Sequence, residues 1–366
     1  AMYNMKMAKP AEELLGNGQW SKLNLVSLVV STVIGLSLSF TYATTPIQQG
    51  LVKLVGIEFS PTLIICVLAM CAIVSSASGL KRGIKWLSNY NTLFAIILMI
   101  GVLVLTVPGD ILSTFVRLVP EYLLKYPAMA TDIGLGDPER KTWLADWLYA
   151  FEAAWYGWFI FTGVFIARIS KGRTLREFIL GVLIAPPLII FIWQSLFGGT
   201  ALHQELNAAM GPGTGQLMGM IRDWNLPEAL FATADALVSN DILSTVLTSL
   251  LIFLLISWFV TSSDSSTLVI TTILSMGDED PLPRHRIFWG VCIGSVAAVL
   301  LMAGGLKALQ TVLMAAALPV SFVILAMTLG LLVALVDESR SVIKSRRQPK
   351  TGPQATPRTA SQTNAG

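Results

Sequence analysis

The fold class is decided by residues 155–178, which read Trp155-Tyr-Gly-Trp158-Phe-Ile-Phe-Thr-Gly-Val-Phe-Ile-Ala-Arg168-Ile-Ser-Lys171-Gly-Arg173-Thr-Leu-Arg176-Glu-Phe178. The first half of this stretch is an aromatic-rich apolar run that is long enough to enter a lipid bilayer as a helix. The second half carries four basic side chains, which are typical of the cytoplasmic end of a membrane-spanning helix. The stretch therefore predicts a helix that leaves the membrane on the cytoplasmic side.

The composition of the whole chain supports the same fold class. Apolar residues make up 54% of the 366 positions and charged residues only 13%, whereas soluble domains have about 25% charged residues. The formal net charge of +3 is too small to indicate a nucleic-acid partner. The sequence contains no phosphate-binding loop, nucleophile elbow or paired-histidine metal motif, so we do not expect an enzyme. We expect an all-α integral membrane protein with several spanning helices and no covalent cofactor.

Eight apolar segments have the length and hydropathy of membrane-spanning helices. When the N-terminus is placed in the cytoplasm, most of the 25 Lys and Arg residues fall in cytoplasmic segments, and the opposite orientation would reverse this bias. Both termini are therefore predicted to be cytoplasmic. The predicted spans are Leu25–Pro46, Thr62–Gly79, Leu87–Val107, Trp143–Ile169, Phe178–Phe197, Ile242–Ser275, Ile287–Ala303 and Leu309–Val336.

Four longer segments are expected to lie outside the membrane, and one of them is the Gly-rich and Asp-rich segment Gly198–Asp241. Residues 1–22 form a cytoplasmic N-terminal segment. Residues 108–142 form an extracytoplasmic segment with the amphipathic stretch Ile111–Leu124, which would lie along the membrane surface or against a neighbouring subunit. Residues 339–366 are basic and then rich in Pro, Thr, Ser and Gln, a composition that predicts a disordered cytoplasmic tail. A topology anchor explains the charge of this tail better than a sensor of anionic lipid does.

A hydroxyl cluster interrupts a long apolar segment and reads Trp258-Phe-Val-Thr-Ser-Ser-Asp264-Ser-Ser-Thr267. Hydroxyl and backbone carbonyl oxygens suit a hard cation such as sodium, and secondary transporters hold such cations near the middle of the bilayer. The alternative is that the hydroxyls donate to carbonyl oxygens one turn earlier in their own helix and bind no ligand. The carboxylate of Asp264 favours the functional interpretation, because carboxylates inside membrane helices are rare and costly.

An aromatic cluster lies on the predicted span Trp143–Ile169. Trp147, Phe151, Trp155 and Trp158 are spaced i, i+4, i+8 and i+11, which places them on one continuous helix face. The faces of tryptophan rings attract a quaternary ammonium ion, so Trp155 and Trp158, with Phe151 beside them, are predicted to bind such a cation. The alternative is a packing stripe with an interfacial aromatic belt, which fits Trp147 better than the two deeper tryptophans.

Glu152 lies beside the aromatic face, one turn before Trp155. An ionised carboxylate is costly to bury in a membrane, so this side chain should be paired, protonated or exposed to a wet cavity. Three interpretations remain open for this candidate binding residue. It is a counter-ion that selects net-positive substrates, a titrating group that couples protons, or a hydrated residue at the outer mouth with no role.

Four parts of the sequence resemble the betaine/carnitine/choline transporter (BCCT) family, and they follow the order of that family. They are Ser78–Asn91, the helix and loop that end with Phe161–Phe178, Phe259–Ser265, and Arg286–Val291 followed by Ala303–Gln310. The resemblance implies a leucine-transporter-like inverted-repeat fold and assembly into homotrimers. It also implies a location in the bacterial inner membrane and uptake of trimethylammonium compounds.

The resemblance begins at the fifth of the family's twelve helices and continues to the C-terminus. It implies that about eight of a probable twelve spans are present. Residues 23–107 would contain the last three helices of the first repeat, and residues 143–338 the five helices of the second repeat. Because the first residue is Ala rather than Met, we expect the chain to be a fragment or a truncated gene product.

The resemblance also implies a sodium site on the hydroxyl cluster. It assigns the hydroxyls of Thr261 and Ser262 as side-chain ligands and the carbonyl of Trp258 as a backbone ligand. Sodium-independent exchangers of the family lack this hydroxyl pair, so its presence favours a sodium symporter.

A second sodium site of the family uses two threonines one turn apart together with an aromatic residue. Thr32 and Phe161 match two of these ligands. Leu36 stands at the position of the second hydroxyl, so the second site is expected to be weak.

The substrate helix keeps the last two tryptophans of the family's motif as Trp155 and Trp158, whereas Glu152 and Ala154 replace the others. We expect sodium-coupled uptake of a quaternary-ammonium compatible solute such as glycine betaine, with sodium as the coupling ion. Two alternatives remain. One is sodium-independent exchange of choline-like or carnitine-like cations, and the other is a membrane sensor that binds the solute without transporting it.

Overall fold

The computed structural model describes residues 19–77, 83–106, 108–208, 216–275 and 281–347. These residues form helices and short connections, and no β-strand occurs among them, which confirms the prediction of an all-α protein. They divide into two units. The larger unit contains residues 24–321, and the smaller unit contains the described residues on either side of that range.

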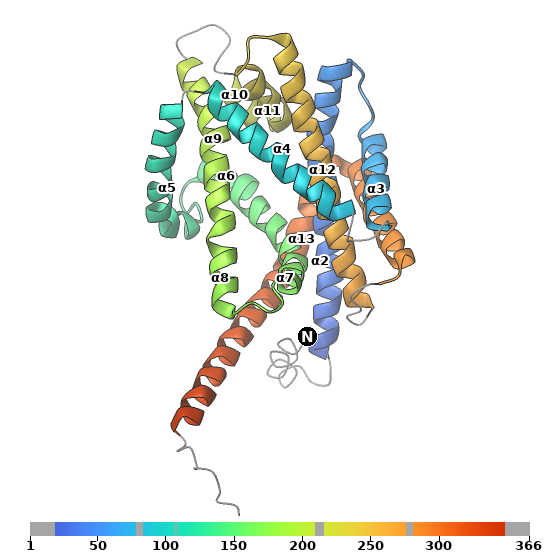
Figure 1. Ribbon diagram of the computed structural model, residues 1–366, viewed down its shortest axis with the longest axis vertical. Coiled ribbons are helices and arrows are strands. Elements are labelled where there is room, and N and C mark those ends of the chain that lie inside the picture. Colours follow the sequence, from blue (N-terminus) through green and yellow to red (C-terminus); the bar gives the residue numbers. More distant parts are fainter. Residues whose placement is uncertain (1–18, 78–82, 107, 209–215, 276–280, 348–366) are drawn as a thin grey trace, which may run out of the picture. The chain divides into compact units, whose positions relative to one another are not determined.

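The order of the helices can be followed in Figure 1. The helices are α2 (Gln19–Val55), α3 (Pro61–Ala77), α4 (Gly83–Leu105), α5 (Pro108–Ala130), α6 (Pro138–Trp143), the π-helix η1 (Leu144–Tyr149), α7 (Ala150–Ile169), α8 (Leu175–Leu183), α9 (Ala185–Ala208), α10 (Leu217–Arg222), α11 (Leu226–Asp235), α12 (Asp241–Leu274) and α13 (Pro283–Arg347). The π-helix η1 joins α6 to α7 without a break.

Five of the described helical segments are long and apolar enough to cross a membrane, which confirms a polytopic membrane protein. They are Trp86–Leu105, Leu175–Leu206, Asp241–Leu274, Pro283–Ala303 and Met314–Arg340. A further apolar helix, at residues 61–76, is shorter. The two other predicted spans are also helical, within α2 and within η1 and α7, and their crossing of the bilayer stays a prediction.

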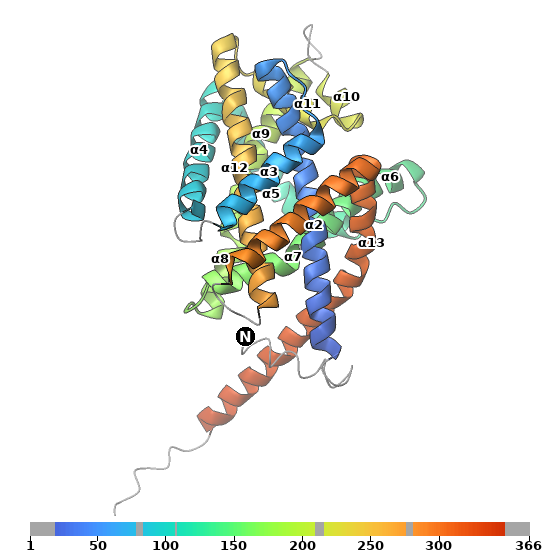
Figure 2. The same cartoon turned by 90° about the vertical axis from the view of Figure 1, so that its right-hand side faces the viewer.

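Helix α12 is the central element of the larger unit, since it contacts α3, α4, α7 and α11. Its apolar residues occupy every side of the helix, as expected for a helix surrounded by others. Phe259 of α12 packs edge to face against Phe40 of α2, with ring centroids 4.2 Å apart. Ile65 of α3 and Ile293 of α13 are buried in the same core. The helices that meet there are seen from the side in Figure 2.

The amphipathic segment forms helix α5, which packs on α9. Tyr122 of α5 meets Phe191 of α9 with ring centroids 5.8 Å apart. Several large apolar side chains of α5 remain exposed, and Leu112, Val116 and Leu123 among them share one face of the helix. An exposed apolar helix face of this kind fits the expected position along a membrane surface or against another subunit.

The basic stretch after α7 forms a tight turn into α8. Gly172 has a positive φ of 88°, which is the backbone conformation that glycine adopts at no steric cost. Thr174 then caps α8: its hydroxyl accepts from the Glu177 N–H, and the Glu177 carboxylate accepts from the Thr174 N–H. The chain therefore turns sharply between the two helices at the end that was predicted to be cytoplasmic.

Helices α2 and α7 cross with their backbones in contact. A methyl group on Gly35 of α2 would lie 2.9 Å from the carbonyl carbon of Gly157 of α7. The indole N–H of Trp158 donates to the Gly35 carbonyl oxygen at 3.3 Å. Small residues allow membrane helices to approach this closely, so the crossing sets where the aromatic residues of α7 lie relative to α2.

Helix α13 continues to Arg347, past residue 339, where the sequence predicted a disordered tail to begin. Residues 339–347 contain Arg and Lys, which form helices well, and the next proline is Pro349. This last part of the helix belongs to the smaller unit. Residues 1–18 and 348–366, which hold most of both predicted terminal segments, lie outside the described residues.

Replacing Gly35 with Ala should destabilise the protein by about 1–3 kcal/mol, because the added methyl group meets backbone that cannot move aside. The midpoint of thermal unfolding in detergent measures the effect. Gly163→Ala is the matched control, since a methyl group on Gly163 of α7 would meet nothing within 4 Å. Equal unfolding midpoints for the two variants would contradict the proposed backbone contact.

Candidate functional site

Two of the predicted substrate-binding residues, Phe151 and Trp155, lie side by side on α7. Their ring centroids are 5.8 Å apart and the rings meet edge to face at 78°. Both side chains are largely uncovered within this chain, with exposed fractions of 61% for Phe151 and 52% for Trp155. Glu152 beside them is exposed as well. Open aromatic faces are what a quaternary ammonium ion requires, so this pair is the part of the predicted site with room for a ligand.

Trp158 faces a different neighbour. Its side chain is half-buried, and its indole N–H is bonded to the Gly35 carbonyl oxygen of α2. The structure therefore gives Trp158 a contact that ties α7 to α2. Its role in substrate binding stays a prediction.

The aromatic face does not continue to Trp147. Residues 144–149 form the π-helix η1, which has more residues per turn than an α-helix and so changes the direction of the side chains before α7. Trp147 stacks instead on Trp224 in the connection between α10 and α11, with ring centroids 4.4 Å apart and an interplanar angle of 13°. Trp224 has a φ of 60°, an uncommon conformation for a residue other than glycine.

The connection that leads into η1 is held by charged groups outside the spanning helices. Asp132 accepts from the Gly134 N–H at 2.9 Å and forms an ion pair with Arg140 at 2.9 Å. The Gly134 N–H and the Arg140 guanidinium lower the pKa of Asp132 below its ordinary value, which keeps the carboxylate ionised. Arg140 also lies over the ring of Trp143, 5.0 Å from its centroid. These contacts anchor the N-terminal end of the aromatic helix.

The hydroxyl cluster of α12 lies inside an unbroken helix. Thr261 donates to the carbonyl oxygens of Ser257 and Trp258, each at 3.0 Å. This is the back-bonding that the alternative interpretation describes. The Trp258 carbonyl, a predicted sodium ligand, thus accepts a hydrogen bond. A hydroxyl has one proton and two acceptor lone pairs, so the lone pairs of the Thr261 oxygen still face away from its own helix.

The other predicted sodium ligands can be described by their position and burial. Ser262 is half-buried next to Thr261. Thr32 of α2 is fully buried one turn before the α2–α7 crossing, and Phe161 follows the crossing on α7 by one turn. The side chain of Phe161 lies outside the described set. The crossing brings the two backbones of the expected second site together, and the binding of an ion there stays a prediction.

Asp264 of α12 carries a carboxylate that is fully buried, since 0% of its surface is exposed. Its oxygen Oδ2 accepts a hydrogen bond from the Ser75 hydroxyl of α3. Its oxygen Oδ1 has no partner among the described residues. Burying a carboxylate without a hydrogen-bond donor strongly destabilises a protein. The hydrogen bond from Ser75 therefore stabilises the packing of α3 against α12.

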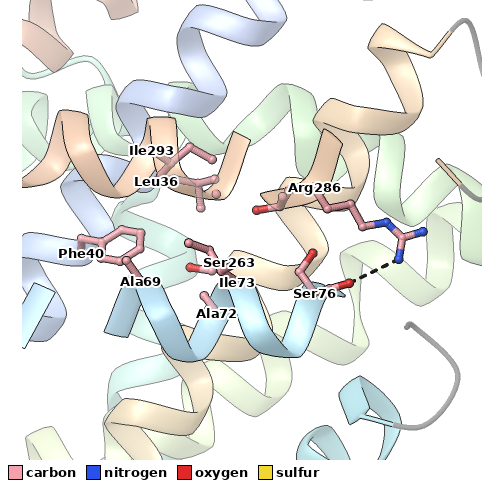
Figure 3. Close-up of a pocket in the computed structure, with 11 residues that line it drawn as sticks. Leu36, Phe40, Ala69, Ala72, Ile73, Ser76, Ser263, Arg286 and Ile293 are labelled. Carbon is pink, nitrogen blue, oxygen red and sulfur yellow. Dashed lines mark hydrogen bonds between the residues drawn. The ribbon is translucent and has the colours of Figure 1, made fainter. Parts of the chain in front are cut away.

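A small cavity lies between α2, α3, α12 and the first part of α13, next to this hydrogen bond (Figure 3). Leu36 and Ile73 line its apolar part, and Ser263 and Arg286 line its polar part. The Arg286 guanidinium donates to the Ser76 carbonyl oxygen at 3.3 Å. The cavity volume is about 10 Å³, which suffices for about one water molecule and excludes a trimethylammonium group.

A larger cavity of about 240 Å³ lies between α4, α9, α10, α11 and α12. Leu98, Phe197 and Leu251 are typical of its apolar lining. The two hydroxyls in its wall, those of Thr200 and Thr233, both donate to carbonyl oxygens of their own helices. The described residues that line this cavity include no charged residue, so they do not suit a charged or zwitterionic solute.

Asn91 of α4 is a buried polar residue that was not predicted from the sequence to belong to the site. Only 4% of its surface is exposed, and its carboxamide N–H donates to the Thr261 hydroxyl oxygen at 3.5 Å. A carboxamide is costly to bury among apolar helices. Its position inside the predicted span Leu87–Val107 could have identified it as a candidate from the sequence. It is also the last residue of Ser78–Asn91, one of the segments that resemble the family.

A comparison with known proteins identifies the family. The family model described as betaine/carnitine/choline family transporter (BCCT) matches residues 6–340. The chain belongs to the BCCT family. This confirms the resemblance that the sequence segments indicated, and the family is described as one of transporters.

Several BCCT relatives are curated as transporters of small solutes. The chain is 35% identical over 338 residues to the glycine betaine transporter OpuD of Bacillus subtilis, an alignment that covers 91% of this chain and 63% of OpuD. It is 34% identical over 325 residues to a glycine betaine/proline/choline transporter of Vibrio parahaemolyticus, covering 88% of this chain and 56% of the relative. For an ectoine/hydroxyectoine transporter of Virgibacillus pantothenticus, the identity is 35% over 304 residues, with 82% and 58% covered. The chain spans 56% to 63% of the length of these relatives.

Replacing Ser75 with Ala should destabilise the protein by about 1–3 kcal/mol, because the buried Asp264 carboxylate loses its donor on α3. Thermal unfolding in detergent again measures the change. The control is Ser249→Ala, since Ser249 of α12 is exposed and donates to the Thr245 carbonyl of its own helix. If both variants unfold at the same temperature, the Ser75–Asp264 bond does not tie α3 to α12.

Proposed function

We propose that the protein takes part in sodium-coupled uptake of a quaternary-ammonium compatible solute such as glycine betaine, by alternating access. The observation that carries this proposal is the edge-to-face pair of Phe151 and Trp155, whose rings stay open on a helix that the sequence predicts to span the membrane. Cation–π attraction from such rings is strong when water is excluded. Membership of a family of betaine, carnitine and choline transporters supports this chemistry.

Sodium coupling is the second part of the proposal. The Thr261 and Ser262 hydroxyls and the Trp258 carbonyl supply oxygen ligands from one turn of α12, and Thr32 and Phe161 supply a weaker second site. One sodium ion that crosses the membrane with the solute gains about 2.3 kcal/mol per 100 mV of membrane potential. This gain is sufficient to concentrate a solute about fifty-fold at 100 mV.

The cellular setting follows from the same proposal. The protein would lie in the bacterial inner membrane with both termini in the cytoplasm, as the distribution of basic residues predicts. It would assemble as a homotrimer. The exposed apolar face of α5, defined by Leu112, Val116 and Leu123, supports a contact with a neighbouring subunit or with lipid.

A second candidate function is sodium-independent exchange of cations such as choline or carnitine. It is favoured by Glu152, whose exposed carboxylate lies one turn from Trp155 and would attract a net-positive solute. Tracer uptake into proteoliposomes, with and without a sodium gradient, separates the two candidates. Uptake that requires the gradient supports the symporter, and exchange without sodium supports the antiporter. Saturable binding with no uptake under either condition would indicate a sensor.

Replacing Trp155 with Leu should weaken glycine betaine binding by about 1–2 kcal/mol, because a ring face over the ammonium group is lost while the helix stays apolar. Equilibrium binding of the radiolabelled solute measures the change. Trp86→Leu is the control, since Trp86 of α4 is exposed to a similar degree and lies outside the proposed site. Unchanged affinity in Trp155→Leu would remove this residue from the site.

Replacing Thr261 with Ala should raise the sodium concentration for half-maximal uptake by about five-fold or more, since one oxygen ligand of the cation is lost. Thr245→Ala on the same helix is the matched control, because Thr245 is exposed and also donates to a carbonyl of its own helix. A sodium dependence that is the same in both variants would mean that Thr261 only back-bonds within α12.

A further inference from the structure

We propose that Asn91 is a third side-chain ligand of the cation held by Thr261 and Ser262. Its carboxamide rotates by half a turn when the cation binds, so that Oδ1 takes the place of Nδ2. This inference rests on the proposed sodium site of α12. It adds a ligand from a second helix, α4, to a set that the sequence confined to α12.

Asn91 is a polar group of α4 that reaches the hydroxyl cluster, because it donates to Thr261. Helix α4 packs against α12, and Asn91 is buried between them with 4% of its surface exposed. Its neighbours on the helix, Asn89 and Thr92, are exposed. The chain therefore places one carboxamide inside the helix pair and leaves the adjacent polar side chains at the surface.

The carboxamide oxygen of Asn91, which is the atom of this side chain that can bind a cation, has no hydrogen-bond partner among the described residues. The Nδ2 group donates to the Thr261 oxygen at 3.5 Å, a long hydrogen bond. The Oδ1 oxygen is buried and has no partner among the described residues. A buried carbonyl oxygen without a hydrogen-bond donor or a cation destabilises the folded protein. This destabilisation is removed in a conformation where the oxygen binds a ligand.

The hydroxyl of Thr261 is oriented to accept rather than to donate toward α4. Its proton points to the carbonyl oxygens of Ser257 and Trp258, both 3.0 Å away. The side that faces Asn91 therefore presents lone pairs, which are the part of a hydroxyl that binds a cation. In this arrangement the Asn91 N–H, with its partial positive charge, occupies the direction from which a cation would approach.

A half-turn of the carboxamide exchanges its oxygen and its nitrogen, which have nearly the same size and shape. The turn would bring Oδ1 to about 3.5 Å from the Thr261 oxygen, the separation that Nδ2 has now. Two oxygens at that distance can share one hard cation as adjacent ligands, with bonds of about 2.4 Å that meet at close to a right angle. The cation would then join α4 to α12 and satisfy the unused oxygen.

Binding of ²²Na⁺ to the purified chain tests this arrangement in three variants. Asn91→Ala removes the ligand and should raise the dissociation constant for sodium about tenfold. Asn91→Asp keeps the shape and the oxygen, removes the N–H and adds a negative charge, so it should bind sodium more tightly than the original chain. Asn89→Ala, an exposed position on the same helix, should bind as the original chain does.

Asn91→Asp also separates a ligand from a structural donor. If Asn91 only donates a hydrogen bond to Thr261, Asn91→Asp loses that bond and binds sodium no better than Asn91→Ala, which overturns the inference. Thr261→Ala in the same assay tests the underlying proposal. Unchanged binding in Thr261→Ala would overturn the sodium site itself. Weakened binding in Thr261→Ala with unchanged binding in Asn91→Ala would overturn only the role of Asn91.

Discussion

The hydrocarbon interior of a bilayer offers no water, so every polar group on a spanning helix must find its partner within the protein. Helix α12 is strongly affected by this constraint, because it carries a cluster of hydroxyls and a carboxylate within an apolar segment. Thr261 meets it by donating to carbonyl oxygens of its own helix, and so do Ser265 and Ser266. A carboxylate cannot donate in this way, so Asp264 depends on the Ser75 hydroxyl of α3. The position of α3 against α12 follows from that dependence as much as from the apolar core around Phe259.

The same constraint identifies the region of the molecule with unused binding capacity. Among the described residues, five buried side-chain oxygens have no partner. Three of them, those of Asn91, Ser263 and Asp264, lie within or face the hydroxyl cluster, and the other two are those of Gln204 and Thr248. Elsewhere in the apolar helices most hydroxyls are paired along their own helix, as in Thr200 and Thr271. Back-bonding and cation binding are therefore compatible at this cluster, because a hydroxyl donates its proton in one direction and offers lone pairs in another.

Much of the fold could be predicted because apolar runs and basic flanks report membrane helices directly. The hydroxyl cluster was found for the same reason, since polar residues are conspicuous in an apolar segment. The split of the aromatic face was not predictable, because a π-helix at residues 144–149 has no signature in the spacing of Trp147 and Phe151. The partners of Asp264 and Thr261, namely Ser75 and Asn91, come from other helices, and one sequence carries no record of which distant residues meet.

The contact of Gly35 with Gly157 has a mechanical consequence. Two helices that touch at a single backbone crossing can change the angle between them while their separation at the crossing stays fixed. The Trp158 N–H bond to Gly35 lies one residue from that point and therefore moves least when the angle changes. Displacement grows with distance from the crossing, so Phe151, six residues before Gly157, moves further than Trp155, which is two residues before it. The crossing is thus a pivot beside the aromatic pair, and it keeps Trp155 close to α2 while the ends of α7 change position.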